Sequence, residues 1–285
     1  MIQASHLTAW QAHAPWPKPS QIEQDLRISR GVAAIFADPD LRDHLAMRGG
    51  TVLHKAHLAP AARYSEDIDL VLVGALETEE LDRTLRRVLA PVLGQPVRSP
   101  IRAAGRAVRN AIRASAILRV DFQFVPIGLD RKETIKVEVN LDESTPLLPL
   151  VTVDLDSLDD DGELVRASAV SYDINEMLGT KARALLQRDQ GRDLFDLFHA
   201  WQLSEAGKTP SRVDGAEAMR ALVWYLKNEG KGTSRHDANA KLDEHLRDPA
   251  FRRDMKTLLR PGLAGYDVDA AAAVVRASYF EHLEE

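Results

Sequence analysis

Cysteine is absent from the 285 residues of the sequence. Disulfide bonds and thiolate metal sites are therefore excluded, and the reducing cytosol is the natural location. The sequence also lacks any run of about 18 apolar residues, and its first twenty residues lack a basic segment followed by an apolar one, so we expect neither a membrane span nor an export signal. Positive charge is not in excess: 37 Lys and Arg accompany 43 Asp and Glu, for a net charge of −6. A polyanionic partner would have to be bound by a local basic patch.

What remains is the composition of a soluble globular protein, with 45% hydrophobic and 28% charged residues. Residues 116–127 and 134–141 predict an antiparallel hairpin, whereas residues 154–163 are acidic and rich in turn formers and predict a surface connection. The C-terminal part has helical spacing to its end. We therefore predict an α+β fold with N-terminal helices in residues 1–165, followed by an all-α domain in residues 166–285.

Two aspartates, Asp67 and Asp69, lie within the otherwise apolar strand-like segment RYSEDIDLVLV at residues 63–73. Strand side chains alternate between faces, so both carboxylates should point the same way with their Cβ atoms roughly 7 Å apart. At an effective dielectric constant of about 20, their repulsion costs on the order of 2 kcal/mol. A divalent cation such as Mg²⁺ would offset that cost. The alternative is a strand end at which both acids face water.

Gly49, Gly50 and Thr51 precede this strand and predict a tight turn from a short strand into a helix. The free N–H groups at such a helix start favour phosphate, and Arg63 could contribute a positive charge to the same ligand. A tight turn without any ligand is the alternative interpretation. The glycine turn combined with the aspartate pair predicts a phosphate-binding turn beside a metal-binding strand.

Three motifs, in this order, resemble those of the AbiEii/AbiGii-type nucleotidyltransferase toxins of the DNA polymerase β-like superfamily. They are GGTVLHKAHLAPAARYSEDIDL at residues 49–70, IKVEVN at 135–140 and EMLGTKARALLQRDQGRDLFDLFHA at 176–200. The resemblance implies a nucleotidyltransferase-like mixed sheet with flanking helices, followed by a helical region that contributes Lys181 and Asp193.

The same resemblance implies an activity and its partners. It implies transfer of a nucleoside monophosphate from an NTP to an acceptor, with release of pyrophosphate, supported by Mg²⁺ or alternatively Mn²⁺. RNA, and specifically the 3′ end of tRNA, is the expected acceptor. A cognate antitoxin protein is the expected partner, so we expect a cytosolic toxin of a toxin–antitoxin or phage-defence system.

By resemblance, Asp67 and Asp69 are catalytic metal ligands, and Glu138 is a candidate third carboxylate on a neighbouring strand. Members of the superfamily often have Asp at this position, so the longer Glu138 leaves open whether it is a metal ligand or a base. An outward-facing strand residue is the alternative interpretation of Glu138.

Lys181 and Arg188 are expected to bind the triphosphate, with Asp193 as a catalytic acid held near the lysine. Lys181 and Arg188 lie seven residues apart on one predicted helix, where a solvated basic face is the alternative. Asp196 competes with Asp193 for the functional role, although it could instead pair with Arg192 and serve the structure.

Six arginines and no acids occur between residues 98 and 119. Four of them, Arg102, Arg106, Arg109 and Arg113, would share one face if this segment is a helix. We call these four residues the arginine stripe and predict that it binds RNA phosphates. A solvated helix face is the alternative.

Two other functions remain open at this point. One is an enzyme of the same fold that modifies a protein or a small molecule instead of RNA. The other is a catalytically silent nucleotide-binding module that acts by interaction.

Overall fold

The structure is a computed structural model that describes residues 2–97, 102–103, 116–263 and 265–285. Arg106, Arg109 and Arg113 of the arginine stripe lie outside the described residues.

The chain divides into two compact units. The sheet unit comprises Met1–Pro146 and Leu150–Tyr172, and the helical unit comprises Leu147–Pro149 and Asp173–Glu285. The boundary expected after residue 165 falls inside a strand of the sheet unit, because that strand continues its backbone pairing to Ser171.

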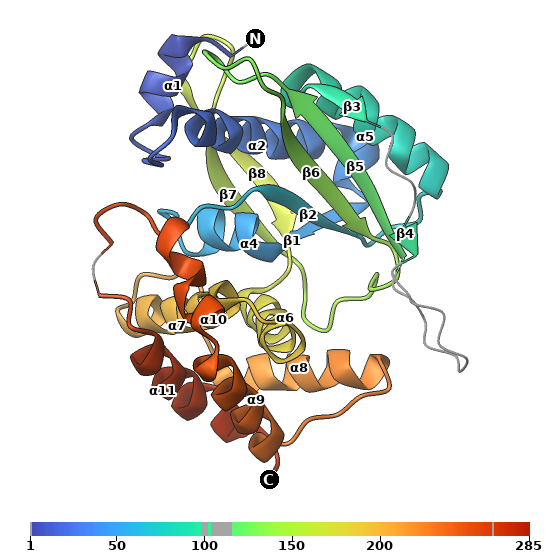
Figure 1. The fold of residues 1–285 in the computed structure, drawn as a ribbon. Helices are drawn as coiled ribbons and strands as arrows, with labels where there is room; N and C mark the ends of the chain where they lie inside the picture. The colour runs from blue at the N-terminus through green and yellow to red at the C-terminus, as the bar shows by residue number, and fades with distance from the viewer. Residues whose placement is uncertain (1, 98–101, 104–115, 264) are drawn as a thin grey trace. The chain divides into compact units, whose positions relative to one another are not determined.

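The elements of both units are labelled in Figure 1. The sheet unit contains α1 (Ala4–Trp10), α2 (Pro19–Ala37), α3 (Pro39–Arg42), β1 (Leu45–Arg48), α4 (Gly49–Val52), a π-helical turn (Leu53–His57), β2 (Asp67–Leu72), α5 (Thr78–Leu93), β3 (Gln95–Val97), β4 (Arg102–Ala103), β5 (Ala116–Phe124), β6 (Glu133–Asn140), β7 (Val151–Leu158) and β8 (Leu164–Ser171). The helical unit contains α6 (Ile174–Gln187), α7 (Gly191–Glu205), α8 (Gly215–Asn228), α9 (Arg235–Arg247), α10 (Pro249–Arg253), α11 (Val268–Ser278) and the 3-10 turns Asp254–Thr257 and Phe280–His282.

The strands form one mixed sheet in the order β3-β5-β6-β2-β1-β8-β7, with β4 paired to β5 (Figure 1). The β2–β6 and β1–β8 pairs are parallel, and the other pairs are antiparallel. The predicted α+β fold with a mixed sheet, flanking helices and a helical C-terminal region is confirmed.

One face of the sheet packs against α2 and α5, which lie side by side (Figure 1). A Cβ on Gly31 of α2 would lie 3.2 Å from Ile68 Cδ1 and 2.9 Å from Leu93 Cδ2, so this contact leaves no room for a larger residue. Ile68 therefore points toward the helices. Its strand neighbours Asp67 and Asp69 point to the opposite face, because side chains alternate along a strand.

The predicted surface connection over residues 154–163 is shorter in the structure, because residues 154–158 belong to β7 and only residues 159–163 connect it to β8 in an antiparallel hairpin. The acids that lowered the strand propensity of this segment have partners across the hairpin. Ser168 donates a hydrogen bond to Asp154 at 2.6 Å, and Arg166 lies 3.6 Å from Asp156. Such cross-strand pairs stabilise strands that local preference disfavours.

The helical unit includes the short segment Leu147–Pro149, which a buried carboxylate fixes. Glu176 of α6 accepts hydrogen bonds from the backbone N–H groups of Leu147 and Leu148 and from the Tyr225 hydroxyl, each at 2.8 Å. Burial of this carboxylate is tolerated because its oxygens accept these bonds. Within the described part of the chain, no helix combines the length and apolar character needed to cross a membrane.

Candidate active site

Four charged side chains lie on the open face of the sheet, the face opposite α2 and α5. Asp67 and Asp69 come from β2, and the parallel strand β6 places Lys136 beside Asp67 and Glu138 beside Asp69. Side chains in register on neighbouring strands share a face. The register therefore brings the three predicted carboxylates to one surface, with one lysine among them.

The two aspartates lie close enough for their charges to repel. Burial, and after it the charge of Asp69, raise the pKa of Asp67 from its ordinary value of 3.8 to about 6. Lys136 opposes this increase, but its Nζ atom lies 3.9 Å from the Asp67 carboxylate and both side chains are about two-fifths exposed. Asp67 is therefore a carboxylate that a nearby cation would stabilise in its charged form.

Asp69 lies directly against Gly49, the first residue of α4 after the end of β1. Gly49 has a φ of +85°, a conformation that favours glycine, and a Cβ at this position would lie 2.1 Å from Asp69 Oδ2. The missing side chain thus creates the space that the Asp69 carboxylate occupies. Gly49 is required at this turn both for its backbone conformation and for contact with Asp69.

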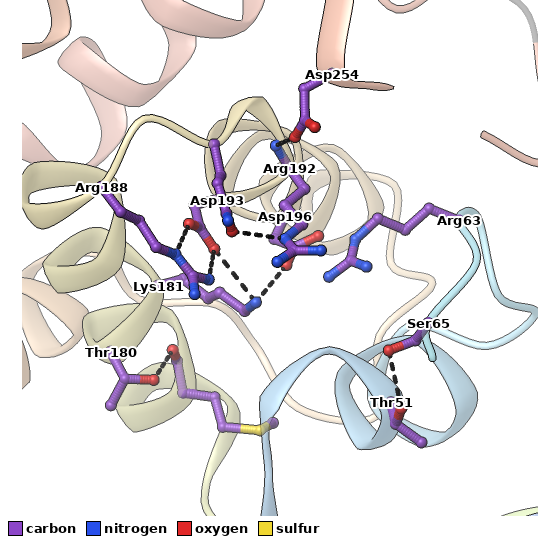
Figure 2. A network of polar contacts seen from close by, with 12 residues as sticks. Thr51, Arg63, Ser65, Thr180, Lys181, Arg188, Arg192, Asp193, Asp196 and Asp254 are labelled. Atoms are coloured by element: carbon purple, nitrogen blue, oxygen red, sulfur yellow. Dashed lines mark hydrogen bonds and ion pairs between the residues drawn. The ribbon is translucent and has the colours of Figure 1, made fainter. Parts of the chain in front are cut away.

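Gly50 and Thr51 fix the turn to the segment that precedes β2. The Thr51 hydroxyl donates to the Asp67 carbonyl oxygen at 2.6 Å and lies 2.8 Å from the Ser65 hydroxyl (Figure 2). A Cβ on Gly50 would lie 2.6 Å from Arg63 Nη2. Thr51 and Arg63 are both buried, and Thr51 bonds directly to the backbone of β2 at Asp67. The sequence did not single out Ser65.

Glu138 is held by the neighbouring strand β5. Its carboxylate lies 3.3 Å from Nη1 of Arg119, whose Nε donates to Asp121 at 3.0 Å. Arg119 is in register with Glu138 on β6, and Asp121 is in register with Lys136. The sequence did not identify Arg119, Asp121 or Lys136 as part of this site. The signal was present, because charged residues two positions apart in an apolar strand lie on the same face.

The predicted set of three carboxylates is not brought together as a metal site. Among the described residues, no group of three or more His, Cys, Asp or Glu is arranged to hold a metal ion. Asp67 and Asp69 alone are compatible with Mg²⁺, which is commonly held by one or two carboxylates and completes its coordination with water and substrate phosphate.

In the helical unit, Lys181 of α6 contacts both candidate acids of α7 (Figure 2). Its Nζ lies 2.8 Å from Asp196 Oδ2 and 3.4 Å from Asp193 Oδ1. Arg188 forms two hydrogen bonds with Asp193, of 2.7 and 2.9 Å, and its side chain is 45% exposed. Two cations therefore balance two buried carboxylates, and Lys181 does not lie on a solvated basic face.

Asp196, for which Arg192 was the alternative partner, contacts Lys181 at 2.8 Å. Arg192 donates its Nε hydrogen to the Gln190 side chain at 2.9 Å. Both Asp193 and Asp196 are completely buried, so the geometry does not separate a functional acid from a structural one.

The arginine stripe would share one face if its segment were a helix, but Arg102 belongs to strand β4, which pairs with β5. The helical spacing therefore does not apply at this residue. Backbone pairing with β5 satisfies the hydrogen-bonding groups that a helix would have satisfied locally.

Comparison with solved structures agrees with this architecture. MenT4, a nucleotidyltransferase toxin from Mycobacterium tuberculosis, is 14% identical, with a TM-score of 0.62 over 100% of this chain and 91% of that chain. JHP933 from Helicobacter pylori is 14% identical, with a TM-score of 0.49 over 92% of this chain and 90% of that chain. At such identities the likeness to MenT4 concerns the fold alone.

No curated protein matches the chain. The sequence model of a family described as "Nucleotidyl transferase AbiEii toxin, Type IV TA system" matches residues 31–274. That match includes β1, β2 and β6, the turn at Gly49 and Gly50, and the group of Lys181, Arg188, Asp193 and Asp196. The chain belongs to the AbiEii family of nucleotidyltransferase toxins from type IV toxin–antitoxin systems.

Proposed function

We propose that this nucleotidyltransferase transfers a nucleoside monophosphate from an NTP to RNA, with the 3′ end of tRNA as the acceptor. The observation that supports the site of transfer is the Asp67–Asp69 pair on the open sheet face, with Asp69 against Gly49. The choice of RNA rests on the resemblance drawn from the sequence motifs and on the arginines of residues 98–119.

Asp67 and Asp69 would hold Mg²⁺, with Mn²⁺ as a substitute, since hard oxygen ligands suit both ions. When bound, a divalent cation neutralises charge on the oxygens of a triphosphate. Glu138 would be a third ligand or a base, and Arg119 holds it through the contact at 3.3 Å.

The remaining predicted residues would bind the nucleotide. The backbone N–H groups at Gly49, Gly50 and Thr51 suit phosphate oxygens, because the start of a helix leaves such donors free of intrahelical partners. Arg63 would act from beneath this turn, where its side chain is buried beside Gly50.

Lys181 and Arg188 would donate to triphosphate oxygens. An ammonium group has three N–H donors, and the contacts of Lys181 with Asp193 and Asp196 use two of them. The exposed part of the Arg188 guanidinium supplies further donors. The two buried carboxylates orient both cations.

In the proposed reaction a hydroxyl oxygen of the acceptor forms a bond to the α-phosphorus of the NTP. The bond from that phosphorus to the bridging oxygen breaks, and pyrophosphate leaves with the bonding electron pair. The hydroxyl proton passes to a base, for which Glu138 is the candidate among the carboxylates of this face.

A cognate antitoxin follows from the family and is the partner that we propose for this chain. Transfer to a protein or to a small molecule is the second candidate function, because the geometry of the Asp67–Asp69 pair does not distinguish one hydroxyl acceptor from another.

The test is incubation of the purified protein with each of four NTPs, labelled at the α-phosphate, together with Mg²⁺ and either total RNA or a protein extract. Label in a tRNA-sized band that disappears on ribonuclease treatment is expected. Label in a protein band would instead favour the second candidate. Asp130→Asn is a matched control for Asp67→Asn, because Asp130 is exposed in the turn between β5 and β6.

A further inference from the structure

Glu138 lies in register between a carboxylate and a cation. On one side, the parallel strand β2 places Asp69 beside it, and on the other side the antiparallel strand β5 places Arg119 beside it. The Glu138 carboxylate contacts Arg119 at 3.3 Å. Glu138 therefore has a cationic partner on the side away from the aspartate pair.

Arg119 is itself fixed by a second carboxylate on its own strand. Its Nε donates to Asp121 at 3.0 Å while its Nη1 faces Glu138. The side chains of Arg119, Asp121 and Glu138 are 23%, 29% and 33% exposed, so all three lie partly within the sheet surface. A planar guanidinium that contacts two carboxylates through different nitrogens restricts the orientation of both.

We infer that Arg119 is a positioning residue for nucleotidyl transfer, which holds Glu138 away from the Asp67–Asp69 pair until a cation is bound there. This inference rests on the proposed metal role of the two aspartates. A cation at the aspartate pair competes with Arg119 for the Glu138 carboxylate. The balance between these two partners sets how strongly Glu138 contributes to metal binding.

The Arg119 contact explains why Glu138 does not join Asp67 and Asp69 as a third metal ligand in this structure. The described residues contain no group of three carboxylates arranged for a metal, although strand register places Asp67, Asp69 and Glu138 on one face. Strand register alone would allow a three-carboxylate site, but the contact with Arg119 fixes the Glu138 side chain in another orientation. Loss of Arg119 should therefore increase metal binding.

The test measures Mn²⁺ affinity by electron paramagnetic resonance of the free ion, without nucleotide. Four proteins form a double-mutant cycle: wild type, Arg119→Gln, Glu138→Gln and the double variant. Arg131→Gln is the matched control, because Arg131 forms an exposed pair with Glu133 at 3.2 Å in the same β5–β6 hairpin. Arg119→Lys retains the charge but not the planar fork.

Arg119→Gln should tighten Mn²⁺ binding by about two- to fivefold, the range expected for release of a partly exposed ion pair. The increase should vanish in the Glu138→Gln background and should be smaller in Arg119→Lys. Arg131→Gln should leave the affinity unchanged. Circular dichroism melting checks that each variant is folded.

Two results would overturn the positioning role. One is unchanged affinity in a folded Arg119→Gln variant. The other is an equal increase in the presence and absence of the Glu138 carboxylate, which would indicate a direct charge effect of Arg119 on the ion. Failure of the proposed metal site gives a different result: Asp67→Asn and Asp69→Asn would then bind Mn²⁺ as the wild type does.

Discussion

The Asp69 carboxylate occupies the space that a side chain at residue 49 would fill: a Cβ on Gly49 would lie 2.1 Å from Asp69 Oδ2. Strand β2, which we propose to bind metal, and the turn at Gly49, which we propose to bind phosphate, are therefore coupled by direct contact. A substitution in the turn should change the position of the carboxylate as well as the backbone of the turn.

Gly49→Ala should abolish nucleotidyl transfer and weaken Mn²⁺ binding, because the new methyl group displaces Asp69. Gly128→Ala is a close control. Gly128 has a φ of +78°, near the +85° of Gly49, but a Cβ there meets nothing within 4 Å. The control should lose only about 1–2 kcal/mol of stability from the backbone conformation and should keep its activity. Equal loss of activity in both variants would show that Asp69 is not the cause.

Asp67→Asn should stabilise the metal-free protein at neutral pH. Folding raises the pKa of Asp67 from 3.8 to about 6, so the native state holds this proton more tightly than the unfolded state. The contribution of Asp67 to stability is therefore greatest below pH 4 and is lost as pH rises toward 6. Melting temperatures in chelator should show this pH-dependent difference between wild type and Asp67→Asn. Asp130→Asn should follow the wild type throughout.

Metal affinity should fall on acidification through the same pKa. A carboxylate must lose its proton to bind a divalent cation, and half of Asp67 is protonated at a pH of about 6 in the metal-free protein. Below that pH, the apparent Mn²⁺ affinity should decrease by up to about tenfold per pH unit for one displaced proton. Titrations between pH 5 and pH 8 measure this dependence. Constant affinity over this range would mean that Asp67 is not a ligand.

Lys181 should have separable roles in stability and in triphosphate binding. Lys181→Met removes the cation that lies 2.8 Å from the buried Asp196, and loss of one partner of a buried ion pair typically costs about 3–5 kcal/mol. The double variant Lys181→Met with Asp196→Asn removes both charged partners and should recover much of that stability. It should not recover NTP affinity, measured by calorimetry. Recovery of NTP affinity in the double variant would assign Lys181 to structure alone.

The arginine stripe should act on the acceptor and not on the nucleotide. Replacement of Arg102, Arg106, Arg109 and Arg113 by Gln should raise the KM for RNA and leave the KM for NTP unchanged. Each lost phosphate contact should reduce the slope of log K against log salt by roughly 0.7–0.9. An unchanged slope in a folded variant would remove the arginines as a reason for choosing RNA.

The sequence was informative where a residue conflicts with its local surroundings. Two aspartates in an apolar strand predicted a metal site at β2. Their two-residue spacing alone was enough to predict that both side chains lie on the same face of the strand. The contact of Lys181 with Asp193 was expected from a motif within two adjacent helices, so few residues separate the partners.

The features that the sequence did not predict depend on pairing between distant segments. Glu138 contacts Arg119 only because the β5–β6 hairpin adopts one particular register. Likewise, the acids of β7 disfavour a strand until β8 supplies Arg166 and Ser168 as partners. The strand at Arg102 also arises from pairing with β5 and not from local propensity.

Transfer of label from α-phosphate-labelled NTP to RNA, compared among wild type, Asp67→Asn, Asp69→Asn and Asp130→Asn, is the most direct test of nucleotidyl transfer at the aspartate pair. Wild type and Asp130→Asn should label RNA equally. The two strand variants should lose about a hundredfold or more of the rate while remaining folded, because loss of a metal ligand costs several kcal/mol of transition-state stabilisation. RNA labelling at the wild-type rate by folded Asp67→Asn and Asp69→Asn would contradict the assignment of this pair as the metal-binding centre.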